Sequence, residues 1–369
     1  MGLFLALSLA RAGIPFRVYE SRTEIRRESR SIGIHPPSLE LLASLDLVDR
    51  FVANGVQVER AEVHGEGGKI GAMSFGACRP PFRFVLTLPQ MLTELFLREA
   101  LEARVPGAIE TAHVKSVSEA RAAGVRVDLV NDRGAKEERE HPIVVACDGK
   151  RSAVRESLGV AFEGRTYPGR YAMADFRDTT SLGSAAAIYL GKEGLLESFP
   201  LPAGFRRWVV RCTDAEDAGT RCVVERVKER AGIDLEEENA EYASTFRANR
   251  FLANRFSVGR VAFAGDAAHE ISPIGGQGMN LGWIGAAMLA KTIAASRESE
   301  NPTRALAADA AERRRHAVVA ARRAELNMWL GRPVGGTRIR DAVLAQILDS
   351  PARHVLARSV TMRGLHGGI

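Results

Sequence analysis

The chain has 369 residues, of which 46% are hydrophobic, and this is enough apolar material for the cores of about two domains. Its 51 basic and 45 acidic residues leave a net charge of +6, without the clustered charge typical of nucleic-acid-binding proteins. No apolar run approaches the roughly 20 residues that a membrane span requires. We therefore expect a cytoplasmic protein with no membrane span and no nucleic-acid partner.

The four cysteines, Cys78, Cys147, Cys212 and Cys222, form no CxxC pair and have no histidine at zinc-ligand spacing. This pattern predicts reduced, partly buried thiols and no metal site, as is usual for a cytoplasmic protein.

The first part of the chain alternates helix and strand patterns. Apolar spacing over residues 2–12 predicts a helix that Gly13 ends, and residues 14–20 predict a strand whose last residue is an acid. The apolar start lacks the basic residues of a signal peptide, so we interpret it as part of the fold. Further helices are predicted at about 36–53 and 89–104, and strands at 125–130 and 143–146, the last of the buried parallel type.

The second part begins with strand-like runs between residues 170 and 213, separated by Gly, Pro and Asp turn signals that favour an antiparallel sheet. A buried strand at 258–264 and a long apolar helix at about 278–296 follow. Residues 303–330 and 338–360 predict Arg-rich helices. Alternating strands and helices with an inserted antiparallel block predict an α/β nucleotide-binding domain that carries a second, sheet-rich domain.

The most specific signal is the string from Gly265 to Asn280. The strand at 258–264 delivers the carboxylate of Asp266 to the end of a sheet, and glycines then let the backbone pass close to a ligand before a helix begins. The helix N-terminus directs unpaired N–H groups and a partial positive charge at that ligand. Such a site suits an anionic ring, and Asp266 suits sugar-type hydroxyls, although glycine-rich loops alone also serve other ligands.

A second acid follows another buried strand. Asp148 and Gly149 come directly after residues 143–146, and Ser152 and Arg155 open a short helix. Asp-Gly alone is only a turn signal, but this spacing offers an acid and a helix terminus beside a polyanion.

The N-terminus carries a third pattern, which matches the second half of a dinucleotide-binding βαβ unit. Glu20 lies close to the distance of about 20 residues from Gly2 that is expected for a ribose-binding acid.

Together these three motifs resemble those of the FAD-dependent, single-component aromatic hydroxylases, which are p-hydroxybenzoate hydroxylase-like flavoprotein monooxygenases. The resemblance covers most of residues 2–330. It implies an α/β fold in which an FAD/NAD(P)-binding Rossmann-like domain carries an inserted antiparallel-sheet substrate domain and C-terminal helices. The expected bounds are 1–75, 90–169 and 255–330 for the FAD-binding domain, 76–89 and 170–254 for the substrate domain, and 331–369 for the C-terminal helical segment.

The resemblance also implies an FAD site with NAD(P)H as the second cofactor. Asp148 belongs to a motif that contacts the FAD pyrophosphate and serves NAD(P)H, Asp266 is implied to bind the ribityl chain, and Glu20 the adenosine ribose. The other implied FAD contacts are Gly2 at the first helix, Arg30 beside the phosphates, Gln90 at the flavin, the backbone of Val114 near the adenine, and Pro273, Gly275, Gly276, Gly278, Met279 and Asn280 along the flavin ring.

The chain departs from the family pattern in two places. Gly285-Ala286 stands near the position of the usual Asp-Ala pair. The strand and first two glycines of G-x-G-x-x-G are absent before Gly2, and Met1 stands where the residue before the third glycine is expected. We expect the native gene to run further upstream, and a chain that starts at Met1 to bind FAD weakly, because the helix terminus would lack its glycine-rich cradle.

The implied reaction is hydroxylation of an aromatic or polyketide-like small molecule: NAD(P)H reduces FAD, O2 adds, and a flavin hydroperoxide transfers one oxygen to the ring. The strands between 170 and 213 would roof the substrate. Arg206 and Arg207, placed on a turn, are expected either to bind an anionic substrate or NADPH or to be surface arginines. Tyr171, Tyr189 and His269 are weak candidates for the group that takes a phenol proton. His35 faces the substrate or caps a helix, and the sequence favours the cap.

Two other functions remain open from the sequence. The chain has no Trp-x-Trp-x-Ile-Pro stretch of the kind found in flavin-dependent halogenases. A flavin oxidoreductase of the isoprenoid type and a non-catalytic flavin-fold remnant are the alternatives. Neither the substrate nor the choice between monomer and homodimer follows from the sequence.

Overall fold

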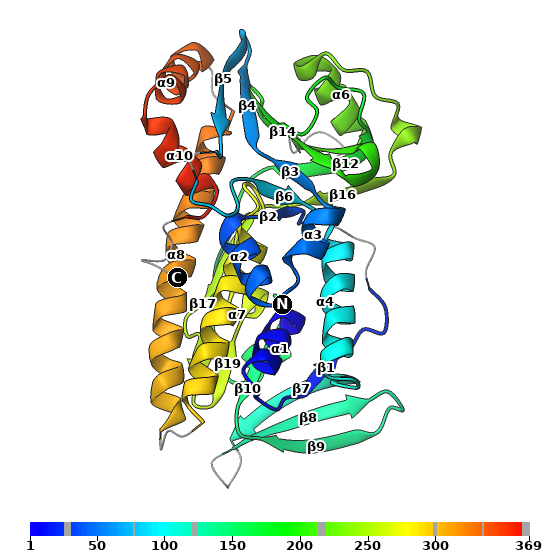
Figure 1. The fold of residues 1–369 in the computed structure, drawn as a ribbon, viewed down its shortest axis with the longest axis vertical. Coiled ribbons are helices and arrows are strands. Elements are labelled where there is room, and N and C mark those ends of the chain that lie inside the picture. Colours follow the sequence, from blue (N-terminus) through cyan, green and yellow to red (C-terminus); the bar gives the residue numbers. More distant parts are fainter. Residues whose placement is uncertain are drawn as a thin grey trace.

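The computed structural model describes residues 1–25, 31–76, 78–119, 124–212, 219–297, 301–333 and 336–363. The chain forms a mixed α/β fold in which a large sheet lies above a part built from short parallel strands and long helices (Figure 1). The predicted fold class is confirmed.

The lower part begins with helix α1 (Gly2–Arg11), which leads into strand β1 (Val18–Glu20). Five residues of α1 are buried, and Phe4 stacks on Trp283 of helix α7 (Gln277–Ala295) with ring centroids 5.2 Å apart. Strand β1 pairs in parallel with β7 (Ile109–Glu119), which continues through β8 (Val125–Asn131) to β9 (Lys136–His141) by antiparallel pairing.

A second parallel pair lies in the same part of the molecule. Strand β10 (Val144–Ala146) pairs with β19 (Val261–Phe263), and β18 (Ser257–Val258) is antiparallel to β19. The parallel strand expected at 143–146 is therefore present, whereas the single strand expected at 258–264 is a hairpin of two short strands, because the chain turns between Val258 and Val261.

The upper part is a seven-stranded sheet. Its pairs are antiparallel except for β13 with β4, which confirms the antiparallel pattern expected between residues 170 and 213. Two of its strands come from residues 60–74, a stretch that the expected bounds placed in the FAD-binding domain. The alternation of apolar and polar residues along a strand does not reveal which sheet the strand joins. In spatial order the strands are β16 (Tyr242–Phe246), β12 (Arg170–Arg177), β15 (Phe205–Cys212), β14 (Gly194–Leu201), β13 (Ala186–Gly191), β4 (Arg60–Gly65) and β5 (Gly68–Ser74).

Two short sheets connect these parts. One consists of β2 (Gly33–Ile34), β6 (Val85–Thr87) and β3 (Val56–Val58), and the other of β11 (Phe162–Thr166), β17 (Asn249–Ala253) and β20 (His269–Glu270).

Two of the expected helices are divided. The helix expected at 36–53 is α2 (Pro36–Ser44) and α3 (Val48–Asn54), because Asp46 adopts φ 58° between them. The helix expected at 338–360 is α9 (Thr337–Asp349) and α10 (Ala352–Val360), with Pro351 at the junction. The others are α4 (Gln90–Arg104), α5 (Ala153–Ser157), α6 (Thr220–Ala231), α7 (Gln277–Ala295) and α8 (Pro302–Leu330), with 3₁₀ turns at Pro202–Gly204, Glu237–Asn239 and Gly265–Ala267.

The expectation of four reduced cysteines is wrong for two of them. Helix α6 packs on β12 and β15, and this packing brings Cys222 against Cys212, with which it forms a disulfide. Cys78 and Cys147 are free. Among the described residues, no helix is both long and apolar enough to cross a membrane.

Candidate functional site

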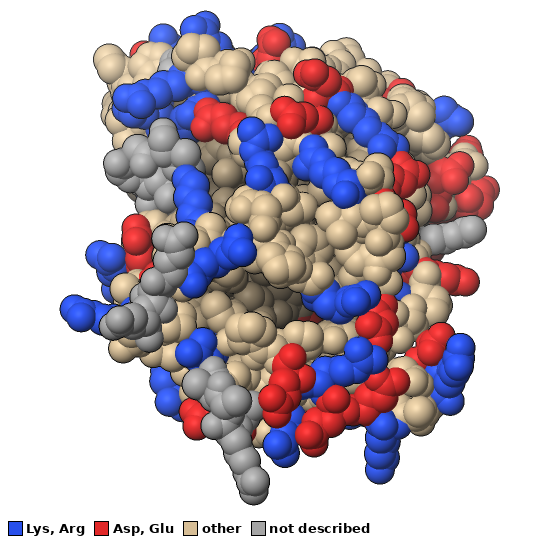
Figure 2. Space-filling view, turned by 60° about the horizontal axis from the view of Figure 1, so that its bottom comes forward, with Lys and Arg blue, Asp and Glu red and all other residues tan. Residues whose placement is uncertain are grey.

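A cavity of about 1690 Å³ lies between the lower part and the large sheet. Its walls come from α1, β1, the turns after β10 and β19, the start of α7, and one face of the seven-stranded sheet. The face shown in Figure 2 is hollowed, and uncharged residues line the recess with charged side chains of both signs around it.

The register of the second parallel pair explains why two acids meet at this cavity. Ala146 of β10 lies opposite Phe263 of β19, so both strands end at the same edge. Asp148 follows β10 by two residues and Asp266 follows β19 by three. Both acids line the cavity, which the sequence could predict because parallel strands place their carboxyl ends together.

Asp266 is exposed to the cavity and accepts no hydrogen bond from any described residue. The surrounding protein excludes much of the water, and this desolvation raises the pKa of Asp266, with the Glu270 carboxylate adding to the effect and Lys150 opposing it. A carboxylate in such a place is stabilised by a ligand that donates hydrogen bonds, such as a sugar-type hydroxyl.

Arg155 connects the two acid-bearing turns. Its buried guanidinium donates to the carbonyl oxygens of Ala267 at 3.1 Å and Lys150 at 2.7 Å, and it lies 4.0 Å from the ring centroid of Phe162. Ser152 caps α5 by accepting from the backbone N–H of Arg155 at 2.9 Å. These contacts fix the two turns relative to one another.

The glycine-rich segment places the N-terminus of α7 at the cavity wall. Gly276 is the N-cap of α7 with φ 65°, and no side chain caps the helix. A Cβ at Gly276 would lie 3.3 Å from Nε2 of His35, so a larger residue is disfavoured by both conformation and space. The cavity-lining residues of this segment are Pro273, Gly275, Gly276, Gly278 and Met279.

Asn280, expected along the flavin ring, does not line the cavity. Its amide Oδ1 accepts from the backbone N–H of His35 at 2.8 Å, and its Nδ2 donates to the carbonyl oxygens of Gly33 at 2.9 Å and Gly276 at 2.8 Å. Asn280 therefore holds the loop around Gly33 against α7 instead of presenting its amide to a ligand.

The expected adenosine end of the site is also assembled in the cavity wall. Glu20 accepts hydrogen bonds from the backbone N–H and guanidinium of Arg22. Desolvation alone would raise the pKa of Glu20, but these hydrogen bonds and the charge of Arg22 lower it. Gly2, Gln90 and Val114 line the same cavity, while Arg30 lies outside the described residues.

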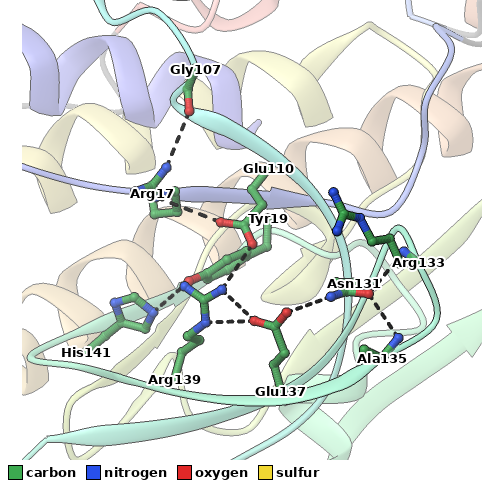
Figure 3. Close-up of polar contacts among 10 residues, drawn as sticks. All are labelled: Arg17, Tyr19, Gly107, Glu110, Asn131, Arg133, Ala135, Glu137, Arg139 and His141. Atoms are coloured by element: carbon green, nitrogen blue, oxygen red, sulfur yellow. Dashed lines mark hydrogen bonds and ion pairs between the residues drawn. The ribbon is translucent and has the colours of Figure 1, made fainter.

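Beyond Glu20 the cavity reaches the sheet edge drawn in Figure 3. Arg17, Tyr19 and His141 line it, and the Tyr19 hydroxyl lies 3.0 Å from Nε2 of His141. Glu110 and Arg139 are 3.6 Å apart beside this pair. The edge therefore combines aromatic surface with hydrogen-bonding groups.

The large sheet forms the opposite wall, and its pleat decides which of the expected side chains reach the cavity. Neighbouring residues of a strand point to opposite faces. Arg207 and Ile188 line the cavity, whereas Arg206 and Tyr189 do not.

Both arginines are buried, so the expectation of surface arginines on a turn is wrong. Arg207 donates to Asp175 at 2.6 and 2.7 Å. Arg206 binds Asp178 at 2.9 Å and three further oxygens, on Gly183, Ala185 and Ser198.

The candidates for taking a phenol proton also lie away from the cavity. Tyr171 stacks on Phe246, and burial raises the pKa of Tyr171 to about 12, which makes it a poor base. Tyr189 stacks on His64 on the other side of the sheet. His269 is buried beside Phe256, and this burial lowers the pKa of His269 to about 4. None of the three lines the cavity.

His35 is the exception among the sequence candidates. It occupies the N-cap position of α2, but its side chain caps nothing and lines the cavity instead, so the favoured capping role is wrong. Burial lowers the pKa of His35 to about 4. Hydrogen bonds with the backbone of Gly275 and Gly276 act in the opposite direction but are the smaller effect. The ring is therefore neutral at pH 7 and helps to hold the glycine loop.

Glu197 is the residue that the sequence analysis missed. It lines the cavity from β14 and is only 7% exposed, and burial raises the pKa of Glu197 to about 7. The signal was present, since an acid inside the apolar run from Leu195 to Phe199 is unusual for a buried strand.

We expect Glu197→Gln to change the pH dependence of stability. The pKa of about 7 in the folded state exceeds the ordinary glutamate pKa of 4.5, so stability is lost as the pH rises from 4.5 through about 7. The substitution removes this loss, a gain of up to about 3 kcal/mol above pH 7 in urea unfolding. The control is Glu163→Gln, at an exposed position. If the free energy of unfolding changed with pH equally in both variants, the raised pKa of Glu197 would be contradicted.

Comparisons with known proteins were made for the whole chain. A family model described as an FAD binding domain matches residues 1–324. The chain is 32% identical over 295 residues to the rifampicin monooxygenase of Streptomyces venezuelae, covering 76% of this chain and 59% of the relative. It is 30% identical over 330 residues to the 12-dehydrotetracycline 5-monooxygenase/anhydrotetracycline 6-monooxygenase of Streptomyces rimosus, covering 85% and 64%. The chain thus spans less than two thirds of either relative.

Solved structures share the fold. A p-nitrophenol 4-monooxygenase from Pseudomonas putida superposes with a TM-score of 0.88 at 23% identity, covering 98% of this chain and 94% of that one. An anhydrotetracycline hydroxylase from Streptomyces rimosus gives a TM-score of 0.77 at 27% identity, covering 98% and 73%.

Proposed function

We propose, from the premise that this chain belongs to the FAD binding domain family, that it is a monooxygenase that hydroxylates an aromatic or polyketide-like molecule with NAD(P)H and O2. The observation that carries the proposal is the convergence of Asp148, Asp266 and the N-terminus of α7 on one cavity that also reaches Glu20. The monooxygenase names of the relatives support the same activity.

The residues present fit FAD. Asp266 is a cavity-facing carboxylate without a donor of its own among the described residues, and α7 begins uncapped at Gly276. We assign Asp266 to the ribityl hydroxyls and the α7 terminus to the flavin ring, where its partial positive charge would stabilise negative charge. Glu20 is assigned to the adenosine ribose, and Asp148 with the start of α5 to the diphosphate side.

When bound, FAD supplies the redox and oxygen chemistry. The chain supplies position and environment: the apolar sheet face covers the reacting ring and excludes water, and Arg155 keeps the two acid-bearing turns at a fixed separation. His35, neutral at pH 7, holds the glycine loop beside the flavin position. No described tyrosine or histidine is assigned as a base.

We propose a domain division in which the lower part binds FAD and the seven-stranded sheet holds the substrate. It differs from the sequence-based bounds in assigning β4 and β5 to the substrate domain, because both strands belong to that sheet. Because FAD and NAD(P)H are supplied in the cytoplasm, we infer that the enzyme is cytoplasmic.

The test uses the purified full chain, FAD and a panel of phenols. We expect the protein to take up FAD, to turn yellow, and to oxidise NAD(P)H faster when a phenol that becomes hydroxylated is present. Mass spectrometry of the product distinguishes hydroxylation from uncoupled oxidation. A protein that shows no flavin binding even when it is titrated with a large excess of FAD would favour the flavin-fold remnant and exclude the enzyme.

A further inference from the structure

The cavity face of the seven-stranded sheet is almost entirely apolar. Strands β4, β5, β12, β13, β14 and β15 bring Ala61, Met73, Met173, Ile188, Phe199 and Val209 to it. A flat apolar surface of this kind fits the face of an aromatic ring system, but it does not orient the ring's substituents.

One side chain on this face can orient them. In the register of the sheet, Glu197 of β14 lies between Ile188 of β13 and Val209 of β15, in the middle of the apolar surface. It is 7% exposed, and no described residue gives it a hydrogen bond or an ion pair. Its hydrogen-bonding capacity is therefore directed to whatever enters the cavity.

Arg207 is the other charged side chain that the strands of this sheet bring to the cavity, and it is paired with Asp175. Nε and Nη2 of the Arg207 guanidinium donate to the two carboxylate oxygens of Asp175 at 2.6 and 2.7 Å, and the guanidinium also lies 5.1 Å from the ring centroid of Tyr242. An Arg–Asp pair of this geometry is close to neutral as a unit. The pair therefore gives little attraction for an anionic substrate.

We propose that Glu197 is a specificity-determining residue of the proposed hydroxylase, and the inference rests on that function. Its carboxyl binds a hydroxyl or amino group on the aromatic substrate, and it disfavours aromatic carboxylates. A buried polar group of this kind discriminates strongly, because a substrate without the matching group leaves the carboxyl desolvated and unpaired.

The protonation behaviour of Glu197 adds a pH signature. Desolvation raises the pKa of Glu197 to about 7, so the carboxyl changes from hydrogen-bond donor to charged acceptor near neutral pH. The charged and titratable groups nearby are Tyr171 and Asp175 on β12 and Arg207 and Arg211 on β15, while β13 places Ile188 opposite. We expect aromatic carboxylates to bind more weakly as the pH rises through 7.

The experiment measures binding by calorimetry to the FAD-loaded full chain. The probes are 1-naphthol, 1-methoxynaphthalene, which lacks the donor, and 1-naphthoate. The variants are Glu197→Gln, Glu197→Leu and the exposed control Glu163→Gln. Wild type and the control should bind 1-naphthol about tenfold more tightly than 1-methoxynaphthalene, as expected for one hydrogen bond to a charged or neutral acid.

In Glu197→Leu the preference for 1-naphthol should disappear, with 1-methoxynaphthalene bound as before, and Glu197→Gln should keep part of it through the amide oxygen. Binding of 1-naphthoate should depend on pH in wild type and not in Glu197→Gln, a difference that a purely structural role would not produce. An unchanged 1-naphthol preference in FAD-loaded Glu197→Leu overturns the assignment of Glu197 alone. Failure of wild type to take up FAD overturns the proposed function, whatever the relative affinities for the three naphthalene probes.

Discussion

Asp266→Ala should abolish the retention of FAD. Asp266 follows the parallel strand β19, faces the cavity, and has no hydrogen-bond donor among the described residues, so its carboxylate is available to ligand hydroxyls. Losing two charge-assisted hydrogen bonds of about 1.5–3 kcal/mol each weakens binding by a factor on the order of 100 or more. The measurement is FAD bound after gel filtration, together with a titration of flavin fluorescence.

The fold itself should survive this substitution. Desolvation raises the pKa of Asp266 in the folded state, so the carboxylate is not a stabilising group there and its removal should not lower the melting temperature. Asp234→Ala, on the surface near the end of α6, is the matched control and should bind FAD as wild type does. Unchanged FAD retention in folded Asp266→Ala would show that the assignment of the flavin end is wrong.

Asp175→Ala should destabilise the seven-stranded sheet by about 3–5 kcal/mol, because it leaves the guanidinium of Arg207 buried without its counter-ion. Arg207 is 1% exposed, and Asp175 lies directly opposite it in the pairing of β12 with β15. Urea unfolding followed by tryptophan fluorescence measures the loss, since Trp208 lies next to Arg207 on the same strand.

The neighbouring pair supplies the control. Asp178→Ala also removes the acid from a buried arginine. Because Arg206 keeps contacts with Gly183, Ala185 and Ser198, we expect a loss below about 3 kcal/mol for this variant, the lower end of the range for a broken buried pair. Adding Arg207→Met to Asp175→Ala should recover part of the lost stability, because no uncompensated charge then remains. If Asp175→Ala and Asp178→Ala lowered the free energy of unfolding equally, the ion pair with Asp175 would not be the main compensation for the burial of Arg207.

The two predictions test different parts of the chain. Asp266 concerns ligand binding by the lower part, and Asp175 concerns the integrity of the sheet that covers the cavity. A protein that loses FAD but keeps its sheet, or the reverse, would support the division between a cofactor-binding part and a substrate-binding part.

The sequence determined the family, and it predicted that Asp148 and Asp266 lie at one cavity. The predicted resemblance to FAD-dependent aromatic hydroxylases is confirmed by the match over residues 1–324 and by the monooxygenases to which the chain is similar. This was possible because Asp148 and Asp266 each follow a short apolar strand directly, so local order along the chain fixes where their side chains emerge.

Only the tertiary structure decided which side chains of the large sheet face the cavity. Along a strand each residue and its neighbour face opposite sides, and which side meets the cavity depends on pairing between segments far apart in sequence. For this reason Arg207 and Ile188 face the cavity, whereas their neighbours Arg206 and Tyr189 face the other side of the sheet. The same pairing places Glu197 in the middle of an apolar face. Likewise β4 and β5 join the large sheet through the parallel pairing of β13 with β4. The local sequence determines that side chains alternate between the two faces of a strand. The long-range pairing of strands determines which of the two sets faces the cavity.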